Sequence, residues 1–138
     1  MVNKLSRETI NISLDATGEG DSYSKAIRGV IKAVEVEYNG LADMSLDLYQ
    51  LNPASTGTGK AIQHILGPIS GKGATPADDN AIYYPRAYSE DITGTDLTFD
   101  GTHKVPTEFI VHGRLYAYAY SGTGAGDSVK LHVYYEEY

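Results

Sequence analysis

Two segments near the C-terminus alternate between apolar and polar or aromatic residues with a period of two. They run from Glu108 to Tyr120 and from Val129 to Tyr135. A period of two places successive side chains on opposite faces of a strand. The glycine-rich run 122–127 lies between the two segments and indicates a turn. The sequence therefore predicts two antiparallel strands joined as a C-terminal β-hairpin.

Placing Tyr120 opposite Ser128 determines the other pairs of this hairpin, because each follows at a step of two. One face is then apolar and is expected to face the core: Leu115, Ala117, Ala119, Val129, Leu131 and Val133. Tyr135 is expected opposite Gly113, where its ring can cover the bare backbone. The other face pairs Arg114 with Tyr134, Tyr116 with His132 and Tyr118 with Lys130.

The rest of the chain shows short alternating segments separated by turn residues, with no convincing helical period. Strands are expected at 9–14, 23–27, 29–38, 44–49 and 60–69, with a loop over 71–80 followed by a short apolar segment at 82–86 that a proline ends. Several short strands without intervening helices are typical of a sandwich or a jelly roll. The 138 residues suit one domain. We expect a single all-β domain, an antiparallel β-sandwich of jelly-roll type, with residues 1–8 as a candidate extended N-terminal arm.

Charge and composition exclude several classes of protein. The net charge of -7 argues against nucleic-acid binding and against contact with anionic membranes. There are no cysteines, so disulfides, thiolate nucleophiles and cysteine zinc sites are excluded. Residues 1–9 contain no apolar segment typical of a secretory signal, and no apolar run approaches the ~20 residues that span a bilayer.

The motifs that could carry chemistry are weak. The segment 58–61 resembles the end of a phosphate-binding loop, but Ala61 replaces the Ser or Thr that would hold magnesium. The four histidines lack the spacing of a chelating pair: His64, His103, His112 and His132. Asp78 and Asp79 leave open a cation site in the loop, against solvated turn carboxylates. No residue is marked as a nucleophile beside a base, so we expect no enzyme, no cofactor and no metal.

Six short elements occur in a particular order along nearly the whole chain, after a first alternating strand. They are Gly18-Glu19-Gly20-Asp21-Ser22-Tyr23, the strand 29–34, Leu46-Asp47-Leu48, Tyr84-Pro85-Arg86, the turn 99–102, and Gly113-Arg114 leading through the glycine loop to the last strand. In this order they resemble the head decoration or auxiliary capsid proteins of tailed bacteriophages.

The resemblance implies a capsid decoration protein that binds the outer head surface and cements neighbouring capsomers against internal DNA pressure. It implies a homotrimer at a threefold or quasi-threefold position, with the major capsid protein as its partner. The location would be the capsid surface of the virion, after synthesis in the host cytoplasm. It brings no catalytic residues.

A subunit of this kind must stay soluble alone and then bury apolar and aromatic surface on assembly. Tyrosine suits such a surface, although it also simply favours strands, and the chain has twelve. The predicted interface residues are Arg114, Tyr116, Tyr118, Tyr120, Lys130, His132 and Tyr134.

Two alternatives stay open. Another layer of the same chain could cover this face, or the chain could be a carbohydrate- or receptor-binding module of a phage fibre or tail, with Tyr83, Tyr84 and Tyr88 on one open surface.

Overall fold

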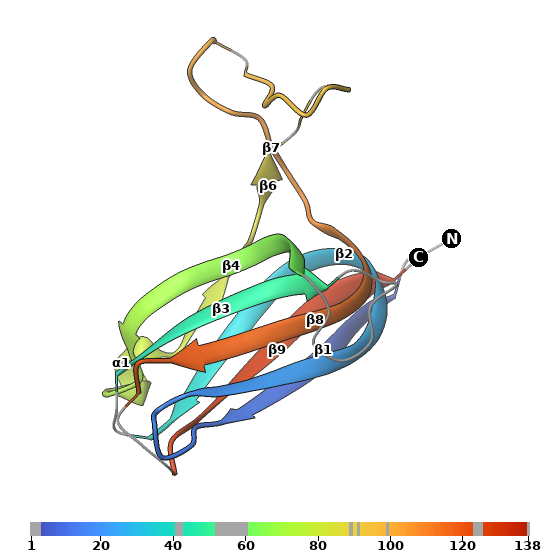
Figure 1. Cartoon of the computed structure of the whole chain (residues 1–138). Helices are drawn as coiled ribbons and strands as arrows, with labels where there is room; N and C mark the ends of the chain where they lie inside the picture. The colour runs from blue at the N-terminus through green and yellow to red at the C-terminus, as the bar shows by residue number, and fades with distance from the viewer. Residues whose placement is uncertain are drawn as a thin grey trace.

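The computed structural model describes residues 4–40, 43–51, 61–88, 90, 92–98, 100–122 and 126–137 (Figure 1). Strands account for most of these residues, as the all-β expectation requires. Their bounds are β1 Leu5–Ser13, β2 Gly20–Asn39, β3 Met44–Leu51, β4 Ala61–Lys72, β5 Ala81–Tyr83, β6 Ala87–Tyr88, β7 Pro106–Thr107, β8 Ile110–Tyr120 and β9 Ser128–Glu137.

The main sheet is antiparallel and has the strand order β1-β9-β2-β8-β3-β4, with β5 also paired to β2. It curls around an apolar core in a sandwich-like arrangement (Figure 1). The all-β, antiparallel part of the prediction is confirmed, whereas the jelly-roll detail is not. The loop expected over 71–80 is partly regular, because β4 continues to Lys72 and the short helix α1 spans Pro76–Asp79. Among the described residues no helix is long and apolar enough to cross a membrane.

The long strand β2 lies at the centre of this sheet. Its first half pairs with β8 and its second half with β9, and Gly29 belongs to both ladders, opposite Val111 and Glu137. The predicted C-terminal hairpin is therefore wrong, since β2 lies between β8 and β9. The alternation that predicted it does hold. All six residues assigned to its inner face are fully buried in the core: Leu115, Ala117, Ala119, Val129, Leu131 and Val133.

Two further expectations for the strands need correction. Residues 5–8, part of the candidate N-terminal arm, pair with β9 as the start of β1. A register shift between Ile31 and Ala33 also changes the faces of β2. Read without a break, the alternation over 29–38 predicts Ile31 on the face opposite Val34 and Val36, but all three are buried in the same core. A bulge inserts one residue and so reverses the faces beyond it.

A long excursion leaves the sheet between β5 and β8. The described residues of the range 86–108, here called the projecting hairpin, extend away from the curled sheet (Figure 1). Strands β6 and β7 pair as its stem, and two isolated bridges beyond them each close a separate loop, Glu90 with Asp96 and Thr98 with Lys104. Its base is anchored, because Phe109 is buried and its carbonyl accepts a hydrogen bond from the N–H of Ile31 at 3.0 Å.

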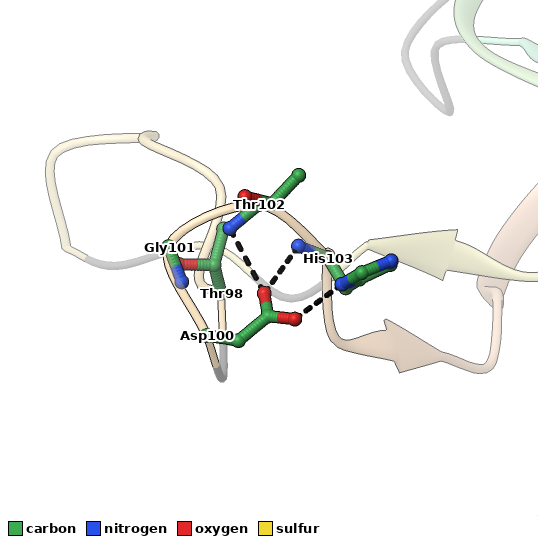
Figure 2. Close-up of polar contacts among 5 residues, drawn as sticks. All are labelled: Thr98, Asp100, Gly101, Thr102 and His103. Atoms are coloured by element: carbon green, nitrogen blue, oxygen red, sulfur yellow. Dashed lines mark hydrogen bonds and ion pairs between the residues drawn. The ribbon is translucent and has the colours of Figure 1, made fainter.

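Aspartates stabilise turns in three separate places. Hydrogen bonds from Thr17 and Glu19 lower the pKa of Asp15, and those from Gly73 and Thr75 lower that of Asp79. In the projecting hairpin, Asp100 accepts bonds from the N–H groups of Thr102, at 2.9 Å, and of His103 (Figure 2), which lower its pKa.

These lowered pKa values predict loss of stability in acid. A carboxylate whose pKa is lower in the folded state stabilises the fold above its unfolded pKa, and this contribution disappears as the pH falls through the folded pKa. Urea unfolding should show a constant free energy near neutrality and a decline below about pH 4. The variant Asp79→Asn should decline less steeply. An identical slope in the variant would contradict the assignment for Asp79.

Candidate interaction face

Five tyrosines lie together on the outer side of β2, β3 and β8, and form what we call the tyrosine face: Tyr23, Tyr49, Tyr116, Tyr118 and Tyr120. The strand order creates it. Tyr116 of β8 lies opposite Tyr23 of β2 on one side and opposite Tyr49 of β3 on the other. The ring centroids are 4.9 Å apart for the first pair and 6.3 Å for the second. Such distances are typical of favourable aromatic pairs.

The aromatic row extends along β8 and to both sides. Tyr118 stacks between its neighbours, with its centroid 6.4 Å from that of Tyr116 and 5.1 Å from that of Tyr120. The guanidinium of Arg114 lies over the ring of Tyr23 at 4.6 Å, a cation–π contact. On β4, the ring of His64 stacks on Tyr49 at 4.7 Å. The aromatic row thus crosses four neighbouring strands of the sheet, β2, β8, β3 and β4.

Carboxylates accept hydrogen bonds beneath and beside these rings. The hydroxyl of Tyr116 donates to Asp21 Oδ2 at 3.0 Å. Burial, followed by this hydrogen bond, raises the pKa of Tyr116 well above its usual value. Burial and then the nearby carboxylates of Glu19 and Asp47 raise the pKa of Tyr118 and Tyr120 in the same way. The hydroxyl groups of Tyr116, Tyr118 and Tyr120 therefore remain uncharged at neutral pH.

Asp47 is a buried carboxylate of β3, only 6% exposed. Its Oδ1 lies 2.8 Å from Nε2 of His64, on the neighbouring strand. Because His64 also stacks on Tyr49, this pair fixes the position of the aromatic row at the β4 side. Side chains held by several contacts lose little rotamer freedom when a partner binds. The tyrosine face is consequently preorganised for contact with another surface.

The predicted interface residues separate into two groups. Arg114, Tyr116, Tyr118 and Tyr120 lie together on β8, as expected. Lys130, His132 and Tyr134 lie on β9 instead, opposite Glu37, Glu35 and Ala33 of β2. The predicted cross-strand pairs between the two groups do not exist. Tyr23 and Ala33 are ten residues apart on β2, about 30 Å along an extended strand.

The second group has its own partners. Nδ1 of His132 is 2.9 Å from the hydroxyl of Thr9, and its Nε2 is 2.9 Å from a carboxylate oxygen of Glu37. These contacts hold the His132 ring between β1 and β2, away from the tyrosine face. Among the described residues no three His, Asp or Glu side chains are grouped to hold a metal ion. The segment 58–60 of the motif that resembles a phosphate-binding loop lies outside the described residues.

The predicted interface did not include two residues of the tyrosine face, Tyr23 and Tyr49, or three residues that contact it or hold it in place, His64, Asp21 and Asp47. Tyr23, Tyr49, His64 and Asp47 lie on strands that were predicted, whereas Asp21 was expected in a turn and instead lies near the start of β2. The missing information was the strand order, which brings β2 and β3 to the two sides of β8.

The projecting hairpin carries exposed apolar side chains. Ile92 is fully exposed, Leu97 is 43% exposed and Tyr88 is 53% exposed. Near its base, Tyr84 is also exposed, whereas Tyr83 packs against the core. The expectation that Tyr83, Tyr84 and Tyr88 share one open surface therefore fails for Tyr83.

Compared with models of known protein families, with curated proteins and with solved structures, the chain matches none of them.

Proposed function

We propose that this chain is a structural component of a bacteriophage virion, a decoration protein that binds the outer surface of the head as an oligomer. One observation supports this function best: the tyrosine face, an ordered aromatic surface on the outer side of a sheet whose inner side already holds the core. Aromatic residues with hydrogen-bonding tips are enriched in protein interfaces. The order of sequence elements that resembles decoration proteins supplies the virion part of the proposal.

Labelling of intact particles tests the virion assignment. An antibody against the purified chain should decorate the heads of tailed particles from the source host in immunogold electron microscopy. Label confined to fibres or tail tips would favour the receptor-binding alternative, for which the exposed rings of Tyr84 and Tyr88 are the supporting observation. Particles without label would contradict both.

A double substitution tests the tyrosine face. Tyr116→Ser with Tyr118→Ser should weaken self-association by a factor of about 30, since each aromatic anchor of an interface contributes about 1 kcal/mol or more. Sedimentation velocity over a concentration series measures this change, and circular dichroism shows whether the variant stays folded.

The matched control is Tyr116→Phe with Tyr118→Phe, which keeps the rings and removes the hydroxyls. It should associate nearly as the parent chain does. Unchanged association of the serine variant would contradict the role of the tyrosine face.

A further inference from the structure

Two surfaces of this chain are complementary in both charge and polarity. The projecting hairpin has two basic and five acidic residues, a net charge of -3, and it carries exposed apolar side chains. Asp21 lies at the far end of the outer side of β2 and β8, but the end near Ile110 is basic, where Arg28 lies opposite His112 and Arg114 follows two residues along β8. This basic end continues directly into the aromatic rings of Tyr23 and Tyr116.

The hairpin is ordered by contacts of its own. Lys104 forms an ion pair with Asp96 at 2.9 Å and lies over the ring of Tyr88 at 4.9 Å. The N–H of Val105 donates to the carbonyl of Leu97 at 3.1 Å. At the base, Nζ of Lys32 lies 2.8 Å from a carboxylate oxygen of Glu108. The hairpin is thus a shaped projection, with Ile92 and Leu97 left in water.

The hairpin extends away from the curled sheet of its own chain (Figure 1). The outer surface of β2 and β8 on a second copy can therefore contact Ile92 and Leu97 on the hairpin of the first copy. Opposite charges would orient the two copies, and burial of apolar and aromatic surface would stabilise the contact.

We propose that the projecting hairpin of one copy docks on the basic and aromatic outer surface of β2 and β8 of the next copy. Arg28, His112, Arg114, Tyr23 and Tyr116 receive the hairpin, and Ile92 and Leu97 are its apolar anchors. Because the two contacting surfaces differ, the contact is heterologous and closes into a ring when rotation brings the last copy to the first. This inference rests on the self-association included in the proposed function, and it names the surfaces that associate.

The first test removes the apolar anchors. Ile92→Ser with Leu97→Ser should raise the dissociation constant of the oligomer about tenfold or more, as for the loss of interface anchors. The control is Leu5→Ser with Ile82→Ser, which removes two other exposed apolar side chains, 63% and 50% exposed. Both variants should keep the melting temperature of the parent chain. Sedimentation velocity of the full chain measures association.

The second test uses the absence of cysteine from the chain. A tagged Ile92→Cys chain is mixed with an untagged Arg28→Cys chain and oxidised. Mixed disulfide dimers should exceed both homodimers. A matched mixture of Ile92→Cys with Ile82→Cys should give few mixed dimers.

Three results would overturn the proposal: a monomeric parent chain, equal weakening by the control pair, or cross-linking only between two Ile92→Cys chains. Gold label on particle heads would still support the virion assignment in each case. Conversely, unlabelled particles with confirmed cross-linking would contradict the virion assignment alone.

Discussion

Replacing Gly29 with alanine should lower the free energy of unfolding by about 3 kcal/mol or more. A Cβ at this position would lie 2.3 Å from the carbonyl oxygen of Glu136 and 3.2 Å from the ring of Tyr135. The first contact is with backbone, which cannot rotate away as a flexible side chain can. Since Gly29 joins the ladders of β2 with β8 and with β9, a shift there disturbs both halves of the sheet.

Gly71→Ala is the matched control for this prediction. Gly71 lies in strand β4 with a φ of +67°, and a Cβ there meets nothing within 4 Å. Its substitution should cost only the backbone penalty of a left-handed residue, about 1–2 kcal/mol. Urea denaturation followed by circular dichroism measures both variants. If Gly29→Ala lowers the free energy of unfolding no more than Gly71→Ala does, the close packing of Gly29 against the backbone of Glu136 is wrong.

The alternation of β8 and β9 illustrates what periodicity can predict. A period of two determines which side chains share a face, and the core positions it assigned, such as Leu115 and Leu131, are fully buried. It carries no information on which strand lies alongside. A turn-rich connection favours a hairpin, but the 20-residue β2 pairs with both strands instead. Adjacent strands in sequence are usual neighbours in space, and here that rule fails.

The candidate site was likewise predictable within one strand, but not across neighbouring strands. The outward tyrosines of β8 followed from periodicity alone, because Tyr116, Tyr118 and Tyr120 occupy alternate positions. The contribution of Tyr23 and Tyr49 depends on strand order, and could not be read from local pattern. The projection of residues 86–108 was also not predictable, because its turn residues and sparse apolar residues are those of ordinary loops.

Removing His64, one partner of the buried Asp47 carboxylate, should have the other large effect on stability. In His64→Leu, the Nε2 group 2.8 Å from Asp47 Oδ1 is lost, while the carboxylate stays only 6% exposed. A buried acceptor that loses its charged or polar partner costs the free energy of its desolvation. Since the side chain of His64 is itself 39% exposed, water can partly replace it. We expect a loss of about 2–3 kcal/mol in the free energy of unfolding, measured by urea denaturation.

Two further variants separate this cause from a simple loss of packing. His64→Gln retains a side-chain donor and should cost clearly less than His64→Leu. Asp47→Leu added to His64→Leu removes both polar partners, and such a replacement can be nearly neutral. The double variant should therefore be more stable than His64→Leu alone. If the two leucine changes instead destabilise additively, the His64–Asp47 pair is not what holds this side of the tyrosine face.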